Sequence, residues 1–305
     1  WAAPLFKVAP SLTGPQAKLA AYRSVLIASQ GSYWPQILAR IPVANEAELK
    51  GLQNLILTSK EVPAWSVVAK NIKTSSPQTQ KALLEVLRIR KFTDASDDVF
   101  SLLSSPDPAV KLAAYQALPS VASAQQADQL FHVLETATGE ETGYAQQALI
   151  QTVGTSNKAE HTNMLLDRAK KSPTPAKYFP VLAANGSDDA LSFVLQQAGT
   201  NQPENKSAIA TLATWADKNA IEPLIVILRS PLDEQTFDQA FGGTISNVRN
   251  SAIQPEQKTL YILDLFELAK TKSQKNAALS ALAATGTYQA LAFAAQYLQD
   301  PDYKG

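Results

Sequence analysis

The chain has 305 residues, with 27 Lys and Arg against 27 Asp and Glu, two histidines and no cysteine. The balanced charge argues against nucleic-acid binding, which needs an excess of Lys and Arg on one face. Without cysteine, the chain cannot form disulfides, iron–sulfur clusters or a thiol nucleophile. The sequence also contains no apolar run long enough to span a bilayer. Because it begins at Trp1 and ends directly after a helical pattern, we expect it to be a soluble piece of a longer protein.

Apolar residues recur at helical spacing along nearly the whole chain. A leucine at the end of an apolar–x–x–apolar–Leu pattern marks each period. These register leucines are Leu26, Leu55, Leu87, Leu118, Leu149, Leu182, Leu212 and Leu282. They are 29 to 33 residues apart except for the last gap of 70, and turn residues separate the periods. The pattern predicts an all-α chain of about nine helical hairpins, of the kind that stacks into a solenoid.

Residues 97–122 show the repeat most clearly. Two short amphipathic helices are predicted at 97–104 and 108–121, joined by the turn 105–107. Asp107 is placed to cap the second helix, and Pro108 falls in the first turn, where a proline costs no hydrogen bond.

Residues 99–118 resemble a HEAT repeat, in which two leucines end the first helix and a Pro-Asp turn leads into a Val-basic-x-x-Ala-Ala second helix. The residues that carry the resemblance are Pro106, Asp107, Val110, Lys111, Ala113, Ala114, Ala117 and Leu118. The resemblance implies a right-handed α–α superhelix, a HEAT-like solenoid, extending over 1–305 as a single domain. It also implies that Asp107 and Lys111 form bonds between successive turns of the superhelix.

The segment 231–254 interrupts the simple pattern with Gly242-Gly243. Two interpretations are open, an irregular insertion that carries function and a divergent repeat. On the first interpretation Phe237, Phe241 and Arg249 are candidate binding residues. The helical pattern resumes at 255–270 and 273–285, followed by a single helix at 287–299.

Residues able to support catalysis are sparse. His132 and His161 lack a third ligand or a nucleophile at fixed spacing, so we interpret both as structural or surface residues. The paired acids at 97–98, 140–141 and 188–189 each fall at a predicted helix N-terminus, where carboxylates stabilise the helix dipole. No phosphate-binding or nucleophile-elbow motif occurs. We therefore expect no enzymatic activity, no metal and no cofactor from this chain.

The position two residues before each register leucine is predicted to face away from the core, on the concave side of the array. The residues at this position are Ser24, Gln53, Glu85, Gln116, Gln147, Pro180, Ala210 and Ser280. The row is nearly neutral, which favours hydrogen bonding to a peptide or glycan over salt-steered contact. Glu85, Gln116 and Gln147 are its candidate binding residues, and a merely solvated surface is the alternative.

The leading hypothesis is a non-catalytic scaffold that binds a protein, a peptide or a neighbouring domain of the same chain. An alternative is an accessory repeat domain of a carbohydrate-processing enzyme of the bacterial cell envelope, because the composition is similar to that of such arrays. That similarity also indicates a secreted or periplasmic protein of a Gram-negative bacterium. A nucleic-acid-binding scaffold is disfavoured by the neutral row.

Overall fold

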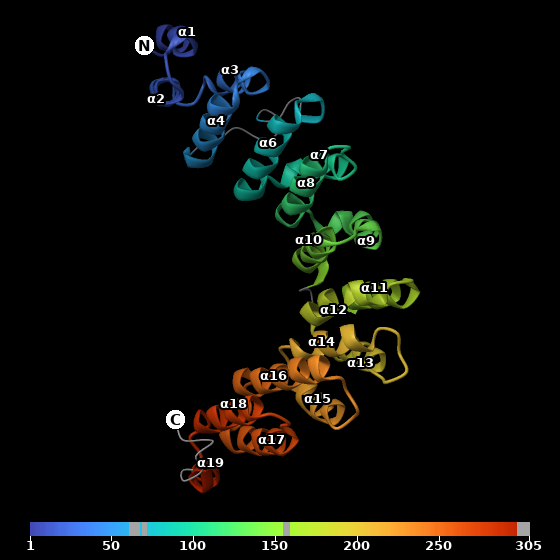
Figure 1. Cartoon of the computed structure of the whole chain (residues 1–305). Helices are drawn as coiled ribbons and strands as arrows, with labels where there is room; N and C mark the ends of the chain where they lie inside the picture. The colour runs from blue at the N-terminus through green and yellow to red at the C-terminus, as the bar shows by residue number, and fades with distance from the viewer. Residues whose placement is uncertain (61–67, 69–71, 155–158, 298–305) are drawn as a thin grey trace. The chain divides into compact units, whose positions relative to one another are not determined.

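The computed structural model describes residues 1–60, 68, 72–154 and 159–297. All regular elements among them are helical, as the sequence predicts, and the chain divides into two compact units, Trp1–Thr152 and Val153–Gly305 (Figure 1). We refer to these as the N-terminal and C-terminal units. The continuity of one array over 1–305 stays a prediction.

The α-helices of the N-terminal unit are α1 (Ala2–Val8), α2 (Pro15–Ala28), α3 (Trp34–Leu38), α4 (Glu46–Thr58), α6 (Pro77–Arg90), α7 (Ser96–Leu102), α8 (Pro108–Val121), α9 (Ala127–Thr136) and α10 (Glu140–Leu149). Those of the C-terminal unit are α11 (Ala159–Lys171), α12 (Phe179–Asn185), α13 (Asp188–Gln197), α14 (Asn205–Ala213), α15 (Ile221–Leu228), α16 (Glu234–Asn250), α17 (Pro255–Leu268), α18 (Lys272–Ala283) and α19 (Tyr288–Ala294). A π-helical turn, Ile150–Gly154, follows α10. In chain order the described helices form eight pairs, with α6 and α19 in addition, which agrees with the prediction of about nine hairpins.

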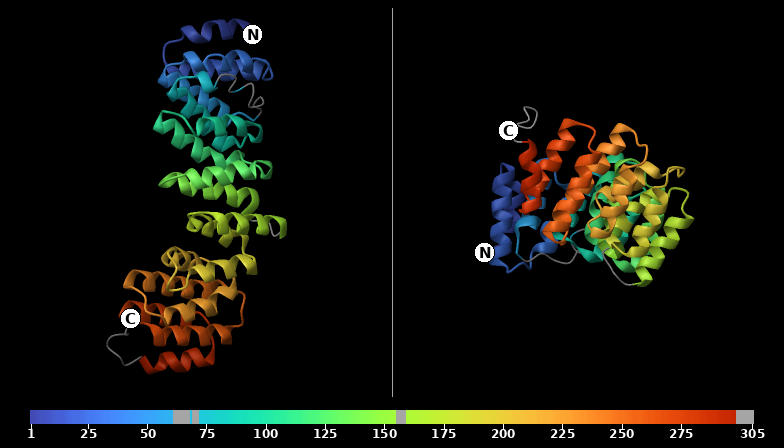
Figure 2. Two further views of the ribbon diagram at one scale, coloured as in Figure 1. Left: turned by 90° about the vertical axis from the view of Figure 1, so that its right-hand side faces the viewer. Right: turned by 90° about the horizontal axis from the view of Figure 1, so that it is seen from below.

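Each unit consists of two layers of helices. The second helices of successive pairs pack on one another, α4 on α6, α6 on α8 and α8 on α10 in the N-terminal unit. In the C-terminal unit α12, α14, α16 and α18 pack in the same way. First helices such as α7 and α9 pack mainly on the second helix of their own pair. The left view of Figure 2 shows the helices of each unit stacked one above another. A repeat that buries its apolar stripe against the next repeat forms an α-solenoid.

The α7–α8 pair shows how the sequence forms a repeat. The Asp107 carboxylate accepts hydrogen bonds from the backbone N–H groups of Ala109 and Val110, at 2.9 and 3.1 Å, so it caps α8 as predicted. Val110 and Leu118 are fully buried, and Pro106 is exposed in the connecting turn. A capped start and an apolar stripe are therefore sufficient to define this unit.

The segment 231–254 is regular, and the interpretation as an irregular insertion is wrong. Residues 234–250 form the continuous helix α16, the second helix of the α15–α16 pair. Ile245 takes the place of a register leucine, 33 residues after Leu212 and 37 before Leu282. The gap of 70 therefore contains one repeat whose marker is isoleucine.

Gly243 lies inside α16 because α14 approaches the helix at this point. A Cβ atom on Gly243 would lie 2.4 Å from the Cβ and the carbonyl oxygen of Ala213, the last residue of α14. Those distances are far inside van der Waals contact, so only glycine fits there. Gly242 meets nothing within 4 Å, since it points away from α14. The glycine pair that indicates a loop in the sequence thus permits two helices to pack closely.

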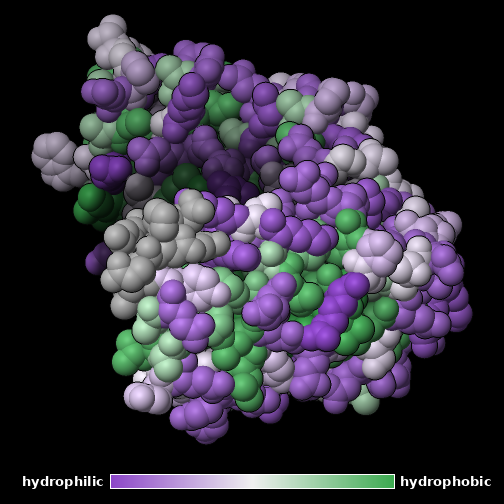
Figure 3. Space-filling view, turned by 60° about the horizontal axis from the view of Figure 1, so that its bottom comes forward, coloured by the Kyte–Doolittle hydropathy of each residue, from purple (hydrophilic) through white to green (hydrophobic). Residues whose placement is uncertain are grey.

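Figure 3 shows hydrophilic side chains over most of the face it presents, with a hydrophobic area in its lower half. In the part of the chain that the structure describes, no helix combines the length and apolarity needed to cross a bilayer.

Candidate interaction surface

The eight residues of the predicted row lie on the second helices α2, α4, α6, α8, α10, α12, α14 and α18. None of them is buried, since each is exposed or half-buried. The pattern therefore places these positions outside the core of each unit. We call the outward face of the second helices the second-helix surface.

In the N-terminal unit, Glu85 lies in an ion pair with Arg88, one turn further along α6. The two side chains form two hydrogen bonds, 2.7 and 2.9 Å long. The hydrogen bond from Arg88 holds the pKa of the Glu85 carboxyl below its usual value, and the same bond raises the pKa of Arg88. The pair is neutral overall, so it keeps this part of the surface without net charge.

Gln116 and Gln147 lie on the neighbouring helices α8 and α10. The Gln116 amide donates to the Tyr144 hydroxyl at 3.3 Å, which connects the two helices across the surface. Gln147 is exposed one turn beyond Tyr144. Successive second helices thus present amide and hydroxyl groups whose remaining donors and acceptors are available to a partner.

Among the described residues, Lys111 makes the bond between repeats that the resemblance implies, whereas the Asp107 carboxylate bonds only within its own repeat. The Lys111 ammonium is 2.7 Å from a Glu141 carboxylate oxygen on α10, and hydrogen bonding to Glu141 raises the pKa of Lys111. The hydrogen bonds found for the Asp107 carboxylate go to the first turn of its own helix. Asp107 is therefore a helix cap, and Lys111 joins two repeats.

The C-terminal unit has a hollow on its second-helix surface with a volume of about 600 Å³. We call it the α16 groove. Its lining residues are Ala213, Thr214, Ala216, Gln239, Gly243, Ser246, Asn247 and Asn250. All of them are small or carry an uncharged amide or hydroxyl group, so the lining is uncharged and combines apolar surface with amide and hydroxyl groups.

Hydrogen bonds inside the α16 groove use only part of its polar capacity. The Asn247 amide lies 3.5 Å from the Leu212 carbonyl oxygen near the end of α14. The Asn250 amide donates to the Ser246 hydroxyl at 3.3 Å. Among the described residues, no side chain or backbone group bonds the exposed amide of Gln239. Amide oxygens and N–H groups therefore remain open to a bound molecule.

Phe237 and Phe241, predicted as binding residues, belong to the core. They are 1% and 2% exposed, and their rings stack with centroids 6.0 Å apart. The Lys270 ammonium lies 3.7 Å from the centroid of Phe237. As members of the inward stripe of α16, they cannot contact a partner directly. Arg249 is exposed and lines a smaller hollow of about 220 Å³ together with Lys258 and Thr285.

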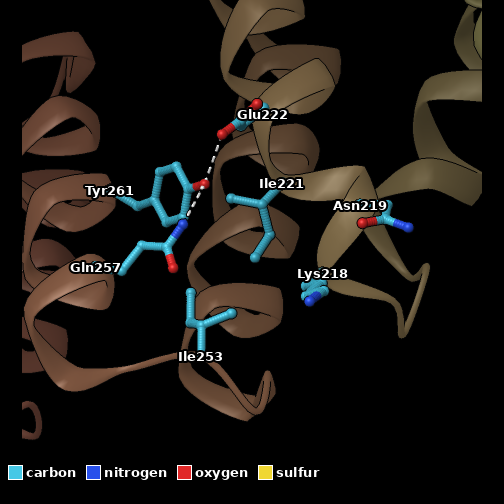
Figure 4. Close-up of a pocket in the computed structure, with 7 residues that line it drawn as sticks. All are labelled: Lys218, Asn219, Ile221, Glu222, Ile253, Gln257 and Tyr261. Carbon is cyan, nitrogen blue, oxygen red and sulfur yellow. Dashed lines mark hydrogen bonds between the residues drawn. The ribbon is translucent and has the colours of Figure 1, made fainter.

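A polar cavity of the C-terminal unit, about 250 Å³, lies where α15 and α17 meet (Figure 4). The Tyr261 hydroxyl donates to the Glu222 carboxylate at 2.7 Å and accepts from the Gln257 amide at 3.1 Å. Burial, followed by the hydrogen bond to Glu222, raises the pKa of Tyr261. These side chains bond mainly to one another, so they join two repeats and leave few groups for a ligand.

The two histidines lie apart from these surfaces. His132 is exposed on α9 and lines a groove of about 590 Å³ between α7 and α9, whose floor includes Phe100 and Tyr115. His161 is half-buried on α11, and its Nδ1 atom has no partner among the described residues. No group of three acidic or imidazole side chains within the described ranges is placed to hold a metal ion.

Comparison with known families agrees with the repeat architecture. Residues 66–150, from just before α6 through α10, match the family model for HEAT repeats. Residues 66–150 are therefore identified as HEAT repeats. The match covers the α7–α8 unit whose residues carry the resemblance in the sequence. HEAT repeats commonly serve as scaffolds for protein interactions. No curated protein matches the chain.

Proposed function

We propose that this chain is a non-catalytic scaffold that binds a partner protein on its second-helix surface. The partner would be a separate protein or a neighbouring domain of the same chain. The observation that carries the proposal is the partly used hydrogen-bonding capacity of that surface. Gln116 and Gln147 in the N-terminal unit and the amides of the α16 groove are accessible without being tied into the core.

The packing of each unit supports the choice of this surface. Because second helices pack on one another, their outward faces form an unbroken surface on which several repeats contribute contacts. First helices such as α7 and α9 stand further apart and pack mainly on their own partners. A partner on the second helices would therefore touch consecutive repeats.

Photo-cross-linking from single positions tests the proposal. A photoreactive amino acid is placed at Gln147 or Ser246 on the second-helix surface and, as a control, at Gln129, which is exposed on the first helix α9. We expect one protein to be captured from Gln147 or Ser246 in source cells, and the purified protein to bind the purified chain. Capture of that protein from Gln129 with equal yield, or no capture from either second-helix position, would contradict the proposal.

A further inference from the structure

The α16 groove arises from a difference in length between neighbouring helices. Helix α14 has 9 residues, while α16 has 17 and continues past the end of α14. Gly243 lets the last residue of α14 pack against the middle of α16. Ser246, Asn247 and Asn250 follow this point and line the hollow, and the Asn247 amide lies 3.5 Å from the Leu212 carbonyl oxygen near the end of α14.

The groove has a length suited to an extended peptide. Its α16 side runs from Gln239 to Asn250, a distance of about 16 Å at the helical rise of 1.5 Å per residue. An extended chain rises about 3.3 Å per residue, so roughly five residues would span it. The lining residues of α16 fall at 239, 243, 246, 247 and 250, which is a single stripe along the helix.

The chemistry of the lining selects main-chain groups. Asn and Gln side chains each offer an acceptor and two donors, which match the alternating N–H and C=O groups of an extended backbone. None of the lining residues is charged, so the groove gives no attraction to an acidic or basic sequence. None is aromatic either, so there is no ring on which a sugar could stack. Ala213 and Ala216 have side chains no larger than a methyl group, which leaves room for a backbone to approach.

We propose that the α16 groove binds an extended, uncharged segment of a partner protein through that segment's main chain. Gln239 and Asn250 form hydrogen bonds with the bound backbone, and the small side chains of Ala213 and Ala216 leave space for it in the groove. The inference rests on the proposed function, because it names the kind of segment that the second-helix surface receives.

The test uses the full chain and a displayed library of random linear twelve-residue peptides. Selected peptides are measured by fluorescence anisotropy against the variants Gln239→Ala and Asn250→Ala, neither of which removes a hydrogen bond to α14. The matched controls are Asn219→Ala and Gln257→Ala, amides of the same unit that line the cavity between α15 and α17. We expect each groove variant to weaken binding about fivefold, as loss of one net hydrogen bond does. The controls should leave the affinity unchanged.

Two further measurements identify main-chain recognition. N-methylation of alternate residues in a selected peptide should abolish binding, whereas alanine replacement of its side chains should weaken it only slightly. Raising the salt concentration from about 50 mM to about 500 mM should change the affinity less than twofold, since no charged group lines the groove.

Several results would overturn the inference. The first is that no recovered peptide depends on Gln239 or Asn250 for binding. The second is that N-methylation leaves peptide binding unchanged, and the third is that the groove binds oligosaccharides of an array instead of peptides. If a partner captured from Gln147 binds without sensitivity to Gln239→Ala or Asn250→Ala, the scaffold proposal survives and this inference fails. The scaffold proposal itself fails if the same protein is captured from Gln129 with equal yield, or if no protein is captured from Gln147 or Ser246.

Discussion

Replacing the two adjacent glycines of α16 by alanine should have opposite effects on stability. Gly242→Ala adds a methyl group where nothing lies within 4 Å, so the variant gains the difference in helix propensity, about 1 kcal/mol. Gly243→Ala gains the same amount but places its Cβ 2.4 Å from the Cβ and the carbonyl oxygen of Ala213. Because one of those atoms is backbone and the other is a Cβ, no side-chain rotation relieves the overlap.

The net cost at Gly243 follows from that overlap. Overpacking of a rigid core costs about 1 to 3 kcal/mol, and an overlap of this depth belongs in the upper part of that range. After the gain in propensity, Gly243→Ala should lower the free energy of unfolding by about 1 to 2 kcal/mol. The two variants should therefore differ by about 2 to 3 kcal/mol, although they differ only in which neighbouring residue carries the methyl group.

Urea unfolding of the two variants, with amide hydrogen exchange of α14 and α16, measures this difference. Exchange separates the local effect from the rest of the array, in which each repeat depends mainly on its neighbours. Faster exchange in α14 and α16 is expected for Gly243→Ala only. Equal stabilisation by both substitutions would refute the close packing of α14 on α16, and with it the origin of the groove.

Three further predictions concern single contacts. Asp233 caps α16 and its carboxyl pKa is lowered to about 2, mainly by hydrogen bonds from Thr236 and then Lys206. The stabilisation of the protein by this carboxylate should therefore be complete above about pH 4 and be lost as the pH falls through about 2. Thermal melts should show this pH dependence, and Asp233→Asn should remove it. Glu48 is 5% exposed, with Arg40 at 3.5 Å and Lys18 at 3.9 Å, so urea unfolding of Glu48→Ala should show a loss of about 2 to 3 kcal/mol. Its control Glu46→Ala, which breaks an exposed pair with Lys50, should cost under about 0.5 kcal/mol, and equal losses would contradict the role of burial. A double-mutant cycle on Lys111 and Glu141 should give a coupling of about 0.5 to 1 kcal/mol, since the pair is partly screened by solvent, and no coupling would mean that it does not join the repeats.

The sequence predicts the α7–α8 pair well because every signal involved is local. Asp107 caps the helix that starts next to it, and the apolar stripe from Val110 to Leu118 repeats at the period of a helix. These signals can be recognised without knowing which helices pack against α8.

The sequence leaves the segment of α16 open between an insertion and a divergent repeat, because the reason for its glycines is not local. Glycine disfavours a helix by about 1 kcal/mol, so a glycine pair indicates a loop unless a neighbouring helix requires the missing side chain. That neighbour is Ala213, thirty residues earlier in the chain. Once α16 is taken as a loop, Phe237 and Phe241 are assigned to the surface, although they belong to its buried stripe.

The groove residues are missed for the same reason. Gln239, Ser246, Asn247 and Asn250 form a stripe only when 234–250 is a continuous helix. A test of the segment for helical periodicity would have shown the apolar positions 237, 241, 245 and 248 on one face. The polar stripe would then have appeared beside them.

Protection of backbone amides from exchange by a bound partner tests the central claim most directly. The partner obtained by cross-linking is added to the full chain, and exchange is followed over both units. We expect slower exchange in second helices, above all α8, α10, α14 and α16, with α7, α9 and α13 unchanged. Protection confined to α7, α9 or α13 would contradict the claim that the second helices form the binding surface.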